Sequence, residues 1–144
     1  MSNKIIALAS DHGGYDLKVI LKAYLLDQGF EVLDLGSAGS ESVDYPDYAA
    51  ALASAIKENR APRGILLCGS GIGISMAANR YRHVRAALVH DRLTAELSRQ
   101  HNDANVLVMG GRVIGPDVAI DCLKAFLNTD FDGGRHQRRI DKMS

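Results

Sequence analysis

The chain has 144 residues, a length typical of one domain, and 47% of them are hydrophobic, which is enough for a core without disulfide or metal staples. Seventeen Lys and Arg residues balance seventeen Asp and Glu residues, which disfavours a nucleic-acid or membrane-surface partner because such partners are held by net positive charge. No apolar stretch approaches the roughly 18 residues that span a bilayer. Two cysteines without metal-ligand spacing suggest thiols in a reducing compartment, so we expect a cytoplasmic single domain over residues 1–144.

Five short aliphatic runs are expected to form strands: Lys4–Ala9, Glu31–Leu35, Gly64–Cys68, Arg85–Val89 and Asn105–Met109. Several are apolar throughout, which indicates a parallel sheet covered by helices on both faces. Helical spacing of apolar residues falls between them, in segments 17–25, 48–56, 93–97 and 119–126. The alternation predicts a Rossmann-like α/β three-layer sandwich with a five-stranded parallel sheet, which binds ligands beyond the carboxyl ends of its strands.

The first strand-to-helix turn, Ser10-Asp11-His12-Gly13-Gly14, offers a carboxylate, an imidazole and free backbone donors together. Asp11 could bind a ligand, or it could simply cap the following helix with His12 beside it by chance. The turn alone does not decide between these interpretations.

The third turn, Cys68-Gly69-Ser70-Gly71-Ile72-Gly73-Ile74-Ser75, is the most informative. Three glycines at alternate positions permit close ligand approach, and successive N–H groups at a helix N-terminus form a nest for an anion. The segment is not a Walker loop, because no Gly-Lys-Ser/Thr follows, and its third glycine comes one residue early for a dinucleotide motif. Ile74 stands where a cysteine phosphatase would have an arginine.

Cys68 is predicted to lie at a strand end beside these N–H groups, which favour its thiolate and suit nucleophilic or general-base chemistry. The alternative is a small core residue, since cysteine is among the most buried residue types. The glycine nest favours the functional interpretation. Cys122, by contrast, falls on an apolar helix face with Leu123 and Phe126, so we expect it in the core.

Three further polar segments complete the candidate set. His101 and Asn102 end a predicted helix, where they could be functional or could only stabilise the helix C-terminus. Arg112 follows the glycines of the fifth strand end. The segment 133–139 concentrates arginines that match phosphate oxygens, although a basic C-terminal stretch can also be a solubilising tail.

Together these motifs resemble the ribose-5-phosphate isomerase type B family, which also includes allose-6-phosphate and galactose-6-phosphate isomerases. The resemblance covers nearly the whole chain and is carried by segments 11–18, 44–46, 68–75, 98–107 and 133–136. It implies an aldose–ketose isomerisation through a cis-enediolate, with no metal or organic cofactor. It also implies a homodimer or homotetramer with shared active sites, in which an extended C-terminal arm after Gly133-Gly134 reaches the neighbouring chain.

The resemblance also implies roles for individual residues. Cys68 matches the base that moves a proton between C2 and C1, and His101 matches the acid that opens the furanose ring. Ile74 stands where another branch of the family has a catalytic glutamate, so Cys68 has no competitor. The implied substrate contacts are Asp11 at a ring hydroxyl; Gly69, Ser70, Gly71, Ile72, Gly73 and Asn102 at the anion hole and sugar; Tyr45 along the site; and His12, Arg112, Arg135 and Arg139, with His136 beside them, at the phosphate.

Other functions stay open at this stage. The substrate could be another aldose phosphate with six or four carbons, because one sequence does not measure the length of the pocket. A noncatalytic sugar-phosphate-binding module would need neither Cys68 nor His101. A thiol redox protein is disfavoured because no resolving cysteine is nearby.

Overall fold

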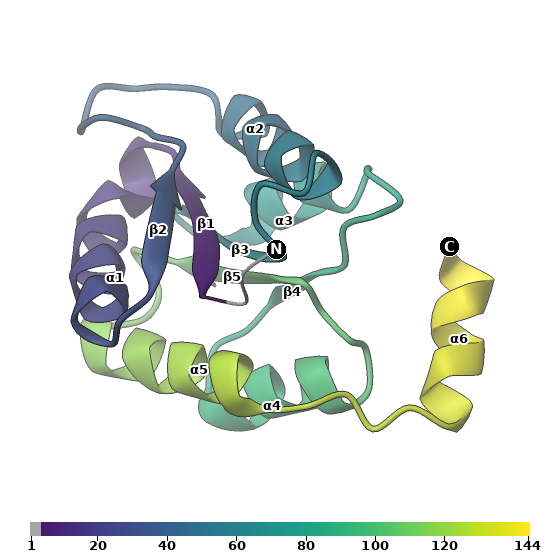
Figure 1. Ribbon diagram of the computed structural model, residues 1–144. Coiled ribbons are helices and arrows are strands. Elements are labelled where there is room, and N and C mark those ends of the chain that lie inside the picture. The colour runs from purple at the N-terminus through teal and green to yellow at the C-terminus, as the bar shows by residue number, and fades with distance from the viewer. Residues whose placement is uncertain (1–3) are drawn as a thin grey trace.

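A computed structural model describes residues 4–144 and, over that range, places five strands in one parallel sheet (Figure 1). They are β1 (Ile5–Ser10), β2 (Glu31–Asp34), β3 (Arg63–Cys68), β4 (Ala86–Leu88) and β5 (Val106–Gly110), in the order β2-β1-β3-β5-β4. Each lies within one residue of a predicted run at both ends. The predicted Rossmann-like α/β fold with a five-stranded parallel sheet is therefore confirmed.

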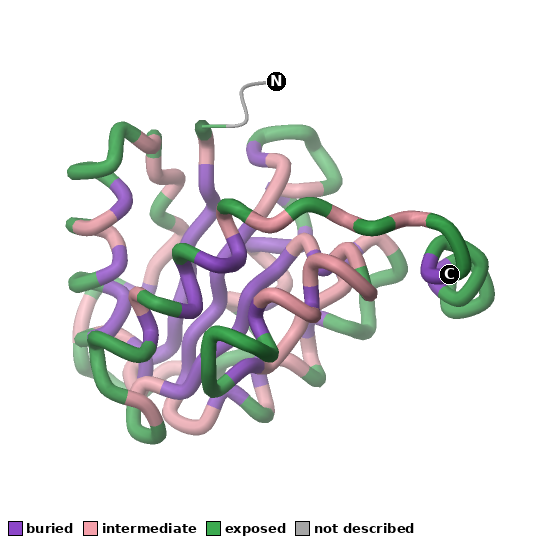
Figure 2. The backbone as a smooth tube through the Cα atoms, turned by 90° about the horizontal axis from the view of Figure 1, so that it is seen from below, coloured by how far each residue is buried: buried purple, intermediate pink, exposed green. Residues whose placement is uncertain are grey.

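Helices cover both faces of the sheet because alternate strand residues point to opposite sides. One face packs against α1 (Tyr15–Asp27), α4 (Arg92–Gln100) and α5 (Pro116–Asn128), and the other against α2 (Tyr45–Lys57) and α3 (Ile72–Ala78). Figure 2 shows buried residues at the centre of the fold, where β1, β3 and β5 are almost wholly buried. Cys122 is completely buried on α5, as predicted. Burial is the main reason that the pKa of its thiol is raised to about 11, and the negative charges of Asp121 and Asp91 raise it further.

The C-terminal segment differs from the extended arm expected from the sequence. After Gly133 and Gly134, both at positive φ, the chain forms α6 (Arg135–Met143). Arg, Gln, Lys and Met are good helix formers, which explains the helix in so polar a segment. Figures 1 and 2 show α6 standing apart from the sheet and its covering helices.

Strand order places a ligand crevice between β1 and β3. From β1 the chain passes to β2 on one side and later returns to β3 on the other, which makes this the topological switch point. Ser10 pairs with Leu67, and Cys68 pairs with Gly110, so the turns after β1, β3 and β5 meet at one edge. None of the helices over residues 4–144 has the length and apolar character needed to cross a bilayer.

Candidate active site

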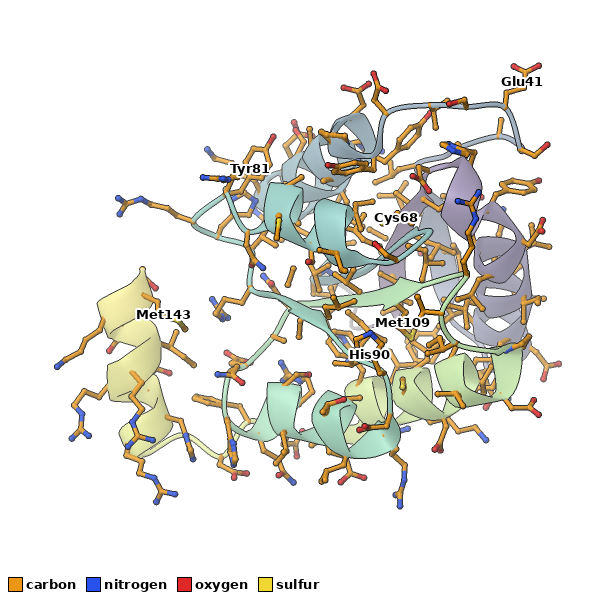
Figure 3. All side chains as sticks on the ribbon, turned by 180° about the vertical axis from the view of Figure 1, so that it is seen from behind. Glu41, Cys68, Tyr81, His90, Met109 and Met143 are labelled. Carbon is orange, nitrogen blue, oxygen red and sulfur yellow. The ribbon has the colours of Figure 1, made fainter. Side chains whose placement is uncertain are left out.

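The thiol of Cys68 lies at the carboxyl end of β3, beside the start of α3 (Figure 3). The residue is 4% exposed, and its Sγ accepts a hydrogen bond from the N–H of Gly71 at 3.1 Å. Such a donor stabilises negative charge on the sulfur. Gly71 has a φ of 80°, and a Cβ there would lie 2.6 Å from Leu88 and 3.0 Å from the backbone of Met109, so only glycine fits.

The loop after Cys68 presents further donors. Within residues 4–144, the N–H groups of Gly69, Ser70 and Gly73 have no hydrogen-bond acceptor, whereas the N–H of Ile72 donates to Ser70 Oγ at 3.1 Å. Backbone donors that lack internal partners at a helix start are suited to an anion or a developing oxyanion. The loop thus combines a base candidate with oxyanion donors.

Asp11 and His12 are oriented by backbone hydrogen bonds. Asp11 Oδ1 accepts the N–H of Gly13 at 2.8 Å and that of Gly14 at 3.2 Å, which caps the short 3-10 helix His12–Gly14 and leaves the second carboxylate oxygen for a ligand. His12 Nδ1 accepts the N–H of Val43 at 3.2 Å. In the neutral ring the proton therefore resides on Nε2, which becomes a donor.

Arg112 and Tyr45 flank the same loop. The N–H of Arg112 donates to the carbonyl of Gly69 at 2.9 Å, and a Cβ on Gly69 would lie 3.3 Å from Arg112 Nη1, so the guanidinium lies over the loop. The Tyr45 ring packs on Gly73, where a Cβ would lie 2.5 Å from it. The turns after β1, β3 and β5 and the start of α2 therefore bring these side chains to one edge of the sheet.

His101 and Asn102 lie at the opposite edge. Since α4 begins beyond the carboxyl end of β4 and runs back to the start of β5, His101 at its C-terminus lies beside the amino ends of the strands. Cys68 pairs with Gly110 at the far end of β5, and four residue steps along a strand are about 13 Å. Within one chain, His101 and Cys68 are too far apart to act on one small sugar.

The C-terminal residues join His101. The rings of His101 and His136 stack with centroids 4.5 Å apart and planes 13° apart. Burial is the main cause that lowers the pKa of the His136 ring, and electrostatic interactions with His101, Arg135 and Arg139 lower it further. A cavity of about 490 Å³ lies between the end of α6 and β4, and Asn102 is among its lining residues. The predicted residues thus form two groups, one around Cys68 and one around His101 and α6.

The separation could have been predicted from the sequence, because segment 98–105 precedes a strand and must lie at the amino edge. Two residues that position site residues could not have been predicted from the sequence. The N–H of Val43 orients His12 across 31 positions of sequence. Arg99 bonds the Asp103 carboxylate at 2.8 Å and the Thr129 carbonyl at 3.2 Å, which fixes the turn that carries His101. Val43 lies outside the motifs named above, and Arg99, although within segment 98–107, reaches Thr129 across 30 positions of sequence.

Comparison with known proteins identifies this arrangement. Residues 6–143 match the ribose/galactose isomerase family. Ribose-5-phosphate isomerase B of Escherichia coli is 44% identical, with 98% of this chain and 95% of the relative covered. A ribose 5-phosphate isomerase from Thermotoga maritima has a TM-score of 0.96 at 53% identity, covering 99% and 98% of the two chains.

A third relative was solved with a ligand. Ribose-5-phosphate isomerase B of Mycoplasma genitalium with bound ribulose 5-phosphate is 45% identical, with a TM-score of 0.92 and coverage of 96% and 93%. The matches extend from β1 through α6 and so include both groups of residues described above. Because both the family and the fold extend over nearly its full length, this chain belongs to the ribose/galactose isomerase family and is a sugar-phosphate isomerase.

Proposed function

We propose that the chain interconverts ribose 5-phosphate and ribulose 5-phosphate through a cis-enediolate, with Cys68 as the base. The observation that carries this proposal is the hydrogen bond from the N–H of Gly71 to Cys68 Sγ, because it holds the sulfur beside the backbone donors of the same loop, where a base must sit. The substrate is supported by the E. coli relative's name and by the ribulose 5-phosphate bound to the M. genitalium relative.

The reaction begins with opening of the furanose ring. His101 gives a proton to the ring oxygen as the bond between C1 and that oxygen breaks, and the C1 hydroxyl gives its proton to solvent water as the C1 carbonyl forms. Asp11 accepts a hydrogen bond from a sugar hydroxyl through its uncommitted oxygen. The extended sugar then presents its C1 and C2 atoms to the thiolate, held in position by binding energy from the remote phosphate.

Isomerisation then moves two protons and no net electrons to or from the enzyme. The thiolate of Cys68 removes the C2 proton, and the electron pair of that C–H bond forms the C1–C2 double bond as the carbonyl oxygen becomes an oxyanion. The N–H groups of Gly69, Ser70 and Gly73 stabilise that charge, each preorganised donor contributing about 3 to 4 kcal/mol. The thiol returns the proton to C1 while the O2 proton passes to O1, giving the ketose.

The site is proposed to be shared between chains of a homodimer or homotetramer. His101 and Asn102 lie at the edge opposite Cys68, so a second copy must supply them if both groups act on one sugar. Ile72 and Met76, next to the Cys68 loop on α3, are 50% and 64% exposed and suit coverage by another chain. This assembly completes the site with an acid and a sugar-binding amide.

The phosphate is proposed to lie between hydrogen-bond donors from both chains. His12 Nε2 and the Arg112 guanidinium come from the chain that holds the base, and Arg135 and Arg139 come from α6 of its neighbour, with the partner's His136 beside them. Arginine forks match phosphate oxygens in geometry and charge. Tyr45 lines the path between the phosphate and the reacting carbons.

We propose that the reaction needs no metal or organic cofactor, since the chain's own acid, base and oxyanion donors suffice for ring opening and for the proton transfers, and no net electrons pass to or from the enzyme. The compartment we propose is the cytoplasm, in keeping with two unpaired cysteines, both of which are buried.

A coupled assay of ribose 5-phosphate conversion tests the proposal, run beside allose 6-phosphate, galactose 6-phosphate and a tetrose phosphate. We expect the highest kcat/KM with ribose 5-phosphate and a loss of at least about 100-fold in Cys68→Ala, as for removal of a general base. Full activity in Cys68→Ala would refute the assigned base. Preference for a six-carbon substrate would move the assignment to another branch of the family.

A further inference from the structure

Three metal-ligating side chains meet where α6 begins. The ring nitrogens of His101 and His136 and a carboxylate oxygen of Asp132 all lie within 4.8 Å of one another. Two imidazoles and one carboxylate are a ligand set that Zn²⁺ accepts, and three protein ligands leave a fourth coordination position open. The described part of the chain brings no other such group together.

Backbone and side-chain hydrogen bonds hold this cluster together. The N–H of Asp132 donates to the carbonyl of Gln100 at 3.0 Å, immediately before His101. Arg99 donates to the carbonyls of Thr129 and Ala104, at 3.2 Å and 2.7 Å, so the linker and the end of α4 share one anchor. Ligands that are already assembled lose less conformational entropy when an ion binds.

We propose that His101, Asp132 and His136 reversibly bind a zinc-class divalent ion, which inhibits the isomerase by coordinating the imidazole of His101. The inhibitory part rests on the proposed role of His101 in ring opening. A ring nitrogen that coordinates an ion cannot carry the proton that the sugar oxygen must receive. The ion is an inhibitor in this scheme and takes no part in the reaction.

The stacked geometry sets the character of the site. A coordinating ion lies in the plane of each ligand ring, whereas the His101 and His136 rings are nearly parallel, so at least one ring must tilt when the ion binds. The positive charges of Arg135 and Arg139 act on His136 and would also repel a cation bound there. Charge attraction alone would therefore not hold an ion in this site. The site should therefore select ions that bind imidazole strongly, such as Zn²⁺, over Mg²⁺.

Calorimetric titration of the reduced, full-length oligomer with Zn²⁺ or Mg²⁺ in a buffer without chelators tests the site. We expect one Zn²⁺ per chain and no heat from Mg²⁺. Asp132→Asn and His136→Asn should each weaken Zn²⁺ binding at least about tenfold, since loss of even an outer-shell partner commonly costs that much. Asp130→Asn changes an exposed carboxylate of the same linker outside the cluster and is the matched control.

Thiols also bind zinc, so Cys68→Ala is titrated in parallel and should retain the Zn²⁺ affinity of the wild type. Loss of binding in Cys68→Ala, equal affinity in the wild type and both ligand variants, or no Zn²⁺ binding would overturn the site. Asp132→Asn and His136→Asn act through different elements, so misfolding of one does not remove the test.

Activity measurements separate the ion site from the proposed function. Asp132→Asn should keep the basal isomerase rate and raise the Zn²⁺ concentration for half-inhibition at least about tenfold. Stoichiometric Zn²⁺ binding without inhibition would overturn the inhibitory role. Zinc binding that follows the variants in a chain inactive on every sugar phosphate would instead refute the proposed function and leave the ion site established.

Discussion

Lys18 Nζ lies 2.7 Å from Asp34 Oδ1 and also donates to the carbonyl of Ser37 at 2.7 Å. Lys18 is only 3% exposed, so this ammonium fastens α1 to the loop that follows β2. The same loop later supplies the Val43 N–H that orients His12. One buried cation thus secures the start of the segment that reaches the candidate phosphate site.

Replacement of this lysine, Lys18→Met, should destabilise the fold by about 2 to 3 kcal/mol. Breaking a fully buried pair costs about 3 to 5 kcal/mol, but the Asp34 side chain is 26% exposed and keeps Lys22 at 3.1 Å, so solvent and the second lysine compensate in part. Urea denaturation at pH 7 measures the change. Lys22→Met, at a lysine whose side chain is 40% exposed, is the matched control and should cost under about 1 kcal/mol. Equal effects of the two substitutions would contradict the proposed role of Lys18 in holding α1 to the loop after β2.

Stability should depend on pH through Asp34. Burial raises the pKa of this carboxyl, but hydrogen bonds from Lys18, the Gly36 N–H and Lys22 outweigh it and hold the pKa below the usual value of about 3.9. A lowered folded-state pKa adds stability above the unfolded pKa, and that stability is lost as pH falls through about 4 toward the folded value. Asp34→Asn should thus cost most at pH 7, and the difference from wild type should shrink below about pH 4. A difference constant from pH 7 to pH 3 would show that the carboxylate charge is not what stabilises the loop.

A methyl group on Gly71 should disrupt the Cys68 loop. Gly71→Ala places a Cβ 2.6 Å from Leu88 at a φ of 80°, so the N–H that faces Cys68 Sγ must move. We expect about 1 to 3 kcal/mol of destabilisation and a fall in kcat of at least about 100-fold, because a shift of this loop also moves the neighbouring oxyanion donors and the loss of one such donor costs about that much. Gly39→Ala, with no atom within 4 Å of its Cβ and no positive φ, should change neither quantity. Unaltered kcat in Gly71→Ala would show that the hydrogen bond from the Gly71 N–H to Cys68 Sγ does not contribute to catalysis.

The residues that could be predicted from the sequence are those with local signals. The glycines around Cys68 mark a tight loop because their spacing requires close approach, and apolar runs mark the strands. Lys18 looks like an ordinary helix lysine, since its partners lie 16 and 19 residues away. The helical form of the C-terminal arm has no such signal, because α6 buries only His136 and Ile140 and so has no apolar stripe. Contacts between residues distant in sequence have no local pattern.

Sharing of the active site between chains can be tested with hybrid oligomers. Mixing Cys68→Ala chains with His101→Asn chains after reversible dissociation produces hybrids in which one composite site has both wild-type residues and the other has neither. In a two-fold symmetric dimer, half of the random pairs are hybrids with one working site of two, so about a quarter of wild-type activity should return. If each chain used its own His101, no site would be complete and no activity would return.

The double variant Cys68→Ala/His101→Asn mixed with wild-type chains gives the opposite outcome and serves as the control. In such a hybrid, one composite site lacks the Cys68 thiol and the other lacks the His101 imidazole, so neither site should work. Each wild-type chain that pairs with a double-variant chain should therefore lose its activity. If sites were confined to single chains, the captured wild-type chain would keep its full rate. Recovery in the first mixture with loss in the second requires that the thiol and the imidazole act from different chains, which is the outcome we expect from their positions at opposite edges of the sheet.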